Sequence, residues 1–246
     1  MTLEIALIVV GILILLVGIA SGITSIWLVI KYYRFNRREN SLGLTGIQIA
    51  RKILDDNGLE HIKVKRTGSL LFGNSYSHYF KKVRLRGLIR HETSLTSMGM
   101  GAQKAALAIL DKEGDADMKK RIRLVPLVTF GPFAFIPLIL IGALIDYFLL
   151  SGSGICTLVL GVIGFLFYGY SIVLSVLTLK TEKKAQNRAY DILGRDYHVT
   201  EAELSALKEL FRLYNIQYVN DIILSSLELL YTALEIAIAV KGNSNR

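Results

Sequence analysis

The chain has 246 residues, of which 52% are hydrophobic, and it carries a net charge of +9 with a mean hydropathy of +0.44. Its apolar residues gather in blocks of membrane-spanning length, which excludes an ordinary soluble globular protein and predicts an integral membrane protein. The basic residues flank these blocks, and no RNA- or DNA-binding motif is present. The positive charge therefore indicates membrane topology and lipid headgroups, not a nucleic acid partner. The single cysteine, Cys156, excludes an intramolecular disulfide.

The first apolar block, Leu3 to Ile30, predicts an uncleaved transmembrane helix within residues 1–30. A signal peptide would begin with basic residues and hold an apolar core of only about 7 to 15 residues. A basic segment, "KYYRFNRR", follows the block directly, and residues 31–123 contain 20 Lys and Arg against 9 Asp and Glu. The positive-inside rule therefore predicts that the N-terminus lies outside and that residues 31–124 lie in the cytoplasm.

The region 31–124 is predicted to contain both helices and strands. The tract "TGIQIARKILDDNG", residues 45–58, has apolar residues at helical spacing and a plausible C-cap at its last glycine. The tracts 59–66 and 81–87 alternate apolar and polar residues around a turn-rich segment, which predicts a small β-hairpin. A second helix is predicted over about residues 94–111. It is apolar almost all round, as is typical of a buried helix.

Two further apolar blocks, Val125 to Leu150 and Ile155 to Leu179, are separated only by "SGSG". They predict a tight transmembrane hairpin over residues 125–179, with the connecting turn outside. Pro132 and Pro137 each remove a backbone donor, so both are expected to kink the first helix of the hairpin.

The last part of the chain is predicted to return to the cytoplasm over residues 180–221 and then to form a fourth apolar block over 222–240. The fourth block carries Glu228 and Glu235, which share a helix face because they lie seven residues apart. A charge at the bilayer centre costs about 2.5–3.5 kcal/mol on insertion scales. The block is therefore either a fourth transmembrane helix with an intramembrane polar pair or a helix in the membrane interface. Residues 241–246 form a short tail.

The chain from about residue 42 to 240 resembles the bacterial membrane-bound neutral zinc metallopeptidase family, the YugP-like proteins. The order of parts matches, and so do local tracts over residues 81–87, 113–131 and 178–193. In the last tract four residues fall on matching positions: Glu182, Ala185, Arg188 and Ala189. The resemblance implies a mainly α integral membrane protein of the bacterial cell membrane. It would have three to four transmembrane helices and a cytoplasmic zincin-like helical region that contains the β-hairpin.

The zinc helix of this family reads H-E-x-G-H-A-I-Q, and the ungapped alignment places that motif on "QKAALAIL", residues 103–110. Two histidines four residues apart bind one zinc ion, and the glutamate takes a proton from zinc-bound water. Gln103 and Leu107 stand at the histidine positions, and Lys104 stands at the glutamate position. The motif is therefore predicted to be vestigial, with no catalytic residue and the zinc of the family lost. Glu182 is the only ligand-type residue that remains.

No displaced motif replaces it. The four histidines are His61, His78, His91 and His198, and no two of them lie four residues apart. Other family positions differ as well: Lys180 replaces a proline, Lys184 replaces an acidic residue, and "NSYS" at residues 74–77 keeps only the tyrosine of an acidic motif. We interpret Glu182 as a carboxylate paired with a lysine, and Arg188 as the partner of a carboxylate.

Three functions remain open from the sequence. The first is a pseudoprotease that binds or regulates a membrane protein, such as an active protease or its substrates. The second is an active membrane zinc metallopeptidase with an unrecognised ligand set, built from Glu182 and a histidine of the hairpin, His61 or His78. The third is a structural or lipid-interacting membrane protein. The lipid bilayer is a partner in all three.

Overall fold

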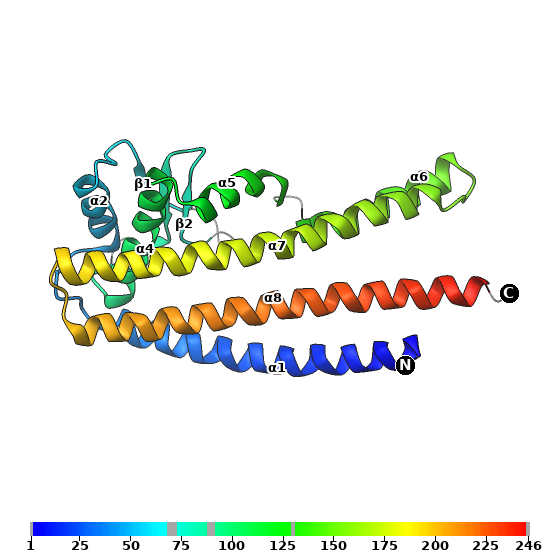
Figure 1. Ribbon diagram of the computed structural model, residues 1–246, viewed down its shortest axis with the longest axis horizontal. Helices are drawn as coiled ribbons and strands as arrows, with labels where there is room; N and C mark the ends of the chain where they lie inside the picture. The colour runs from blue at the N-terminus through cyan, green and yellow to red at the C-terminus, as the bar shows by residue number, and fades with distance from the viewer. Residues whose placement is uncertain (1, 68–72, 88–91, 129–130, 245–246) are drawn as a thin grey trace. The chain divides into compact units, whose positions relative to one another are not determined.

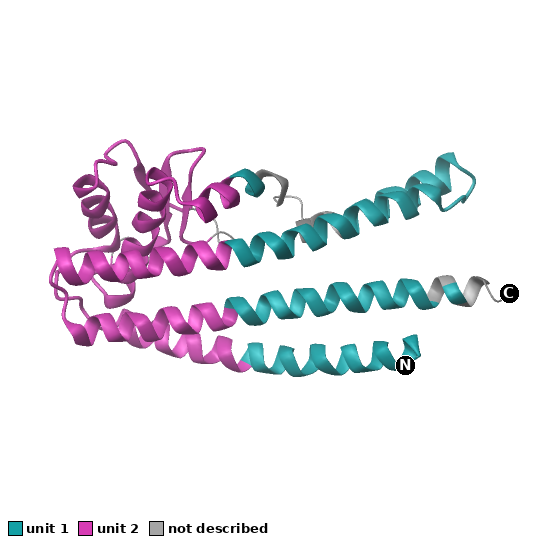
Figure 2. Ribbon diagram, in the orientation of Figure 1, with its two compact units in different colours: residues 1–22, 123–177, 218–246 teal, residues 23–122, 178–217 magenta. Residues whose placement is uncertain are grey.

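The computed structural model describes residues 2–67, 73–87, 92–128 and 131–244. The chain is mostly helical and divides into two compact units, which are coloured separately in Figure 2. Unit 1 comprises residues 1–22, 123–177 and 218–246, and unit 2 comprises residues 23–122 and 178–217. The elements follow one another as labelled in Figure 1: α1 (Leu3–Asn36), α2 (Gly46–Asp56), β1 (Lys63–Arg66), β2 (Ser75–Ser77), β3 (Lys82–Leu85), α4 (Leu95–Lys112), α5 (Ala116–Val128), α6 (Gly131–Leu149), α7 (Ile155–Asp191), a π-helical turn (Ile192–Asp196) and α8 (Glu201–Ser244).

The core of unit 2 is built around α4, which packs most extensively against α2. The Ser94 hydroxyl caps α4 by accepting a hydrogen bond from the backbone N–H of Ser97 at 3.1 Å, and Thr45 and Gln48 form a capping box on α2. Every residue from Leu95 to Leu110 is buried, which confirms the prediction of a buried helix. Gly58 follows the end of α2 with a φ of +65°, as a C-terminal glycine does.

The predicted β-hairpin is wrong in its pairing. The two alternating tracts do form β1 and β3, but these strands are parallel neighbours, with Val64 opposite Val83. The antiparallel partner of β3 is β2, a short strand inside the segment that the sequence indicated as turns, and the sheet order is β1-β3-β2. Alternation reports which face of a strand is buried and does not report its direction, so the pattern found the strands without their pairing. Tyr76 of β2 is buried against the core.

The helix predicted over residues 125–150 is divided. Val125 belongs to the end of α5, and α6 begins at Gly131, so Pro132 lies in the first turn of α6, where a missing N–H breaks no helical hydrogen bond. Pro137 lies inside α6, as expected. Residues 129–130 lie outside the described part of the chain.

The α6–α7 hairpin in unit 1 is held by Asp146 near the end of α6. Its carboxylate accepts hydrogen bonds from the Thr157 backbone N–H at 2.7 Å, from the Thr157 hydroxyl at 2.6 Å and from the Cys156 N–H at 3.0 Å. These donors lie in the first turn of α7, so Asp146 caps that helix from its neighbour. Gly142 allows the helices to approach, because a Cβ there would lie 2.6 Å from the Thr157 Cα.

Two helical stretches of the described chain are long and apolar enough to cross a membrane, Leu3–Asn36 and Ile155–Asp196. The described apolar part of α6, Ile136–Leu149, is shorter. The cytoplasmic helix and the fourth apolar block that the sequence predicted separately are one continuous helix, α8. No proline or glycine interrupts residues 201–240, so nothing breaks the helix between them. A membrane span over residues 222–240 stays a prediction, as do the orientation of the chain and the predicted domain limits.

Replacing Gly101 by Ala should destabilise unit 2. A Cβ at this position would lie 2.5 Å from the carbonyl oxygen of Gly46, so α4 and α2 would have to separate. Overpacking of this kind costs about 1–3 kcal/mol, and we expect a lower midpoint for the thermal unfolding of the detergent-solubilised protein, followed by circular dichroism. The control is Gly18→Ala in α1, where a Cβ meets nothing within 4 Å. Equal midpoints for the two variants would contradict the close contact.

Candidate functional site

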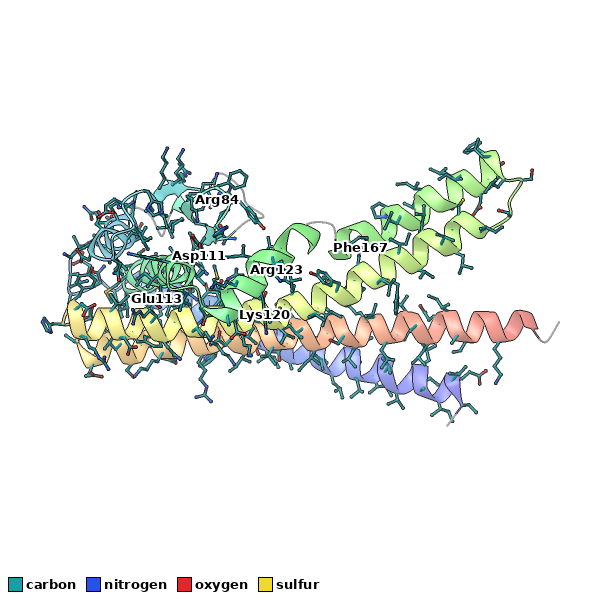
Figure 3. All side chains as sticks on the ribbon, turned by 45° about the horizontal axis from the view of Figure 1, so that its top comes forward. Arg84, Asp111, Glu113, Lys120, Arg123 and Phe167 are labelled. Carbon is teal, nitrogen blue, oxygen red and sulfur yellow. The ribbon has the colours of Figure 1, made fainter. Side chains whose placement is uncertain are left out.

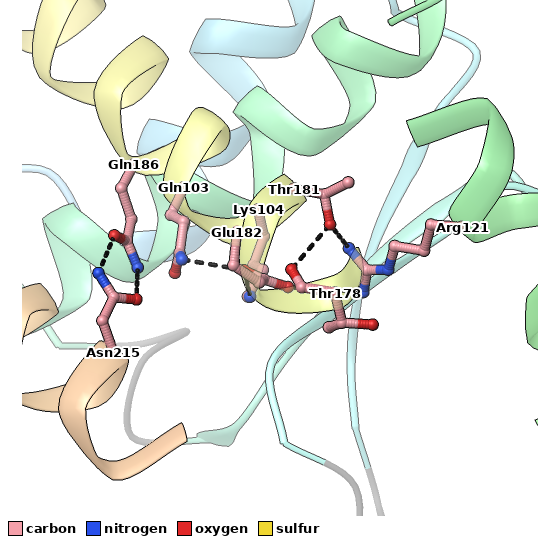
Figure 4. Close-up of polar contacts among 8 residues, drawn as sticks. All are labelled: Gln103, Lys104, Arg121, Thr178, Thr181, Glu182, Gln186 and Asn215. Atoms are coloured by element: carbon pink, nitrogen blue, oxygen red, sulfur yellow. Dashed lines mark hydrogen bonds and ion pairs between the residues drawn. The ribbon is translucent and has the colours of Figure 1, made fainter. Parts of the chain in front are cut away.

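A polar centre in unit 2 joins α4, the helix on which the sequence places the motif positions, to α7. Gln103 and Lys104 lie on α4, and Glu182 lies on α7, 78 residues after the lysine. Figure 4 shows both side chains pointing to the Glu182 carboxylate. The structure therefore brings together three of the positions that the sequence singled out.

The centre is a mostly buried ion pair. The Lys104 Nζ lies 2.7 Å from the Glu182 Oε2, and the two side chains are 9% and 17% exposed. The Gln103 amide donates a hydrogen bond to the same oxygen at 2.9 Å. Arg121 of α5 lies on the other side, with its Nη2 3.5 Å from the Glu182 Oε1. One carboxylate thus holds three helices, α4, α5 and α7, through charge-assisted contacts.

Two cations keep Glu182 ionised. Burial by itself raises the pKa of this carboxyl, but the charges of Lys104 and Arg121 and their hydrogen bonds outweigh burial and leave its pKa below the usual value. Arg121 is in turn oriented by the Thr181 hydroxyl, to which it donates at 3.0 Å. A carboxylate that is already neutralised in this way has little free capacity for a further cation.

The remaining position of the predicted motif lies in the hydrophobic core. It is occupied by Leu107, at the second histidine position, which is 1% exposed. Gln186, one turn after Glu182, exchanges two amide hydrogen bonds with Asn215 of α8 at 3.1 and 2.8 Å. Within the described ranges, no cluster of three or more His, Cys, Asp or Glu side chains could hold a metal ion.

The lysines that differ from the family pattern on α7 are also paired. Lys184 lies 2.6 Å from Asp115 and 2.8 Å from Asp117, and Lys180 lies 3.6 Å from Asp117. Together with Lys104, all three of these lysines therefore meet a carboxylate. The prediction for Arg188 is confirmed, since its Nη2 lies 2.7 Å from the Glu113 Oε1.

A second polar cluster lies at the end of α4, where Figure 3 labels Asp111. Its Oδ2 accepts a hydrogen bond from the Tyr76 hydroxyl at 2.6 Å and lies 2.6 Å from the His78 Nδ1. Sequence reasoning missed Asp111, because nothing in its neighbourhood indicates a partner 33 residues earlier. Burial, followed by the hydrogen bond and charge of Asp111, raises the pKa of Tyr76, so its hydroxyl remains a donor.

The remaining candidates are placed as follows. His78 contacts Asp111 and does not join Glu182, and His61 is exposed. His91 lies outside the described residues. On α8, Glu228 and Glu235 are both exposed, and the Glu228 carboxylate accepts a hydrogen bond from the Tyr168 hydroxyl of α7 at 2.9 Å.

These features define a mostly helical protein that has helices able to cross a membrane and a buried polar centre between its α4 and α7 helices. The chain belongs to the family described as "Putative neutral zinc metallopeptidase", which matches residues 8–237. It is similar to the "Putative membrane protease YugP" of Bacillus subtilis (strain 168), with 24% identity over 200 residues that cover 81% of this chain and 84% of the relative. No solved structure matches the chain.

Replacing Glu182 by Gln should lower the free energy of unfolding by about 3 kcal/mol, because it leaves the buried Lys104 ammonium without its counter-charge. Adding Lys104→Met to Glu182→Gln removes that ammonium and should restore most of the loss. Glu113→Gln, which breaks the half-exposed pair with Arg188, should cost less than about 1 kcal/mol. Thermal unfolding of the three variants measures these differences. A loss from Glu182→Gln no greater than that from Glu113→Gln would contradict the buried pair.

The same carboxyl predicts an acid-sensitive component of stability. The pKa of Glu182 in the folded protein lies below the usual value for a glutamate, so its contribution to stability is complete above that usual value and is lost as the pH falls through the folded pKa. The difference in unfolding midpoint between the wild-type protein and Glu182→Gln should therefore be largest near neutral pH and should shrink below about pH 4.5. A difference that stays constant across this range would show that Glu182 contributes by shape and not by charge.

Proposed function

We propose that this chain is a member of the zinc metallopeptidase family that does not cleave peptides and acts by binding a membrane protein, such as an active protease or its substrate. The observation that carries this proposal is the 2.7 Å contact between Lys104 and Glu182. The lysine stands where the general base of the family stands, and it pairs with the one remaining ligand-type residue.

The residues present do not fit a zinc ion. An ammonium, an alkyl side chain and a primary amide offer none of the thiolate, imidazole or free carboxylate ligands that zinc takes in proteins. Glu182 would have to leave both Lys104 and Arg121 to reach a metal. The doubly charged ion would then lie beside two protein cations that had lost their partner.

A binding role is supported by the pairing of the residues that differ from the family pattern. Lys104, Lys180 and Lys184 each meet a carboxylate, so they join α7 to the neighbouring α4 and α5 helices. A scaffold that keeps its packing after its catalytic positions change can still present the surface with which the family meets other proteins. The Bacillus subtilis relative is named "Putative membrane protease YugP", which supports substrates or proteases of the membrane as the partner class.

The first experiment measures the zinc content of the purified, detergent-solubilised full chain by plasma mass spectrometry, after dialysis against trace zinc. We expect zinc near background, because the described residues of the centre include no ligands that can replace the two histidines and the glutamate. Zinc near one ion per chain would overturn the proposal, particularly together with hydrolysis of a casein substrate that a chelator abolishes.

The matched variant for this measurement rebuilds the motif with Gln103→His, Lys104→Glu and Leu107→His together. These changes supply two imidazoles and a carboxylate at the family positions while Glu182 is released from its lysine. We expect this variant to bind more zinc than the wild-type protein. If both proteins bind no zinc, the vestigial motif loses support even though the wild-type result stands.

A further inference from the structure

The outer face of the small sheet in unit 2 is strongly cationic. Side chains that are paired across neighbouring strands lie on the same face, and the register places Lys63 beside Lys82 and Lys65 beside Arg84. The alternate residues, Val64 and Val83, lie on the opposite face, toward the core. The outer face of β1 and β3 therefore carries four positive charges, which we call the cationic face: Lys63, Lys65, Lys82 and Arg84.

These charges have no acidic partner in the part of the chain that the structure describes, whereas Lys104, Lys180 and Lys184 each meet a carboxylate. Like charges directly opposite one another destabilise a sheet. The pKa of Lys82 is lowered, first by partial desolvation and then by the charges of Arg84 and Lys65. No described carboxylate offsets the repulsion between these four cations, in contrast to the carboxylates that pair with Lys104 and Lys184.

An exposed aromatic residue lies among the cations. Phe80 is 67% exposed, and the Lys82 Nζ lies 4.4 Å from the centroid of its ring, with the Arg84 guanidinium at 5.9 Å. The adjacent Tyr79 is 58% exposed and donates a hydrogen bond from its hydroxyl to the Ile122 carbonyl at 3.0 Å. This bond ties the turn between β2 and β3 to α5 and so fixes the aromatic pair beside the sheet.

We propose that the cationic face binds the headgroups of anionic phospholipids, with Phe80 entering the boundary between headgroups and acyl chains. Clustered Lys and Arg residues are attracted to an anionic lipid surface, and an aromatic ring prefers the headgroup region. The membrane-type helices of the same chain keep lipid at a high effective concentration near unit 2. This inference is independent of the proposed loss of peptidase activity.

An acidic protein is the other partner that a cationic surface could take. A lipid surface fits better because the charges project from two short strands of four residues each and an exposed aromatic ring stands beside them. Anionic lipid requires only charge and an interfacial aromatic group, and both are present.

The test uses the full chain with Trp27→Phe and Phe80→Trp, so that the only tryptophan reports on the cationic face. The protein is reconstituted in phosphatidylcholine vesicles with or without roughly one-third phosphatidylglycerol, each containing a lipid with a spin-labelled headgroup. We expect stronger quenching of the tryptophan in the anionic vesicles. About 1 M sodium chloride should reverse the difference, because the Debye length is then about 3 Å.

Neutralising the cationic face with Lys63→Gln, Lys65→Gln, Lys82→Gln and Arg84→Gln should abolish the difference between the two lipids. Each lost charge should lower the ratio of molecules whose cationic face is bound to lipid to molecules whose cationic face is free by about fivefold. The control removes the same number of exposed charges elsewhere in unit 2: Lys183→Gln, Arg195→Gln, Lys208→Gln and Arg212→Gln. Removing like charges relieves repulsion in the sheet, so we expect the first variant to stay folded.

Three results would overturn the proposal. Quenching that is equal in the two lipids would remove the role of anionic headgroups and leave an acidic protein as the partner to test. Tryptophan quenching that does not change with salt concentration would show that residue 80 contacts lipid for reasons other than charge. If the control variant loses as much of the quenching difference between the two lipids, the effect comes from the net charge of the protein and not from the cationic face. If the variant with four substitutions fails to fold, the salt dependence of quenching in the protein that keeps all four charges still tests the proposal.

Discussion

The buried pair of Lys104 and Glu182 is the contact on which the arrangement of helices in unit 2 depends. It joins α4, the most buried helix, to α7, and through Arg121 it also includes α5. An ion pair of this kind contributes little net free energy when it is intact, since desolvation offsets the Coulomb attraction. Its importance lies in the penalty for separating the two charges, which fixes how the three helices meet.

Three further cations on α7 also pair with carboxylates next to α4 and α5. Lys184 and Lys180 bind the two aspartates at the start of α5, and Arg188 binds Glu113 just after α4. These pairs are more exposed than the central one and are individually weak. As a set they give α7 a row of charged contacts along the side that faces α4 and α5. Hydrophobic packing then supplies the stability, from α2, α4 and the inner face of the sheet.

Sequence patterns predicted the elements better than their connections. Helical spacing found α2 and α4, and alternation found β1 and β3, because each pattern reports local burial. The parallel pairing of β1 with β3 depends on contacts between residues about 19 positions apart, which no local pattern reports. The family resemblance did indicate that residues 103, 104 and 182 belong to one site. The prediction that Glu182 pairs with a lysine is confirmed, but the sequence did not identify the partner as Lys104, because that depends on the reach of one side chain. Asp111 with Tyr76 and His78, and Asp146 as the cap of α7, left no periodic signal at all.

The buried lysine at position 104 also limits which single substitutions this site can accept. A glutamate at 104 alone would face Glu182 across a mostly buried gap, so one carboxylate would have to take up a proton. A histidine at 103 alone would replace a hydrogen-bond donor beside an occupied carboxylate and gain no metal. A histidine at 107 alone would place an unpartnered imidazole in a site that is now 1% exposed and apolar. The single substitutions at 104 and 107 toward the family motif are therefore unfavourable by themselves, so the residues present at these two positions oppose a stepwise change to that motif.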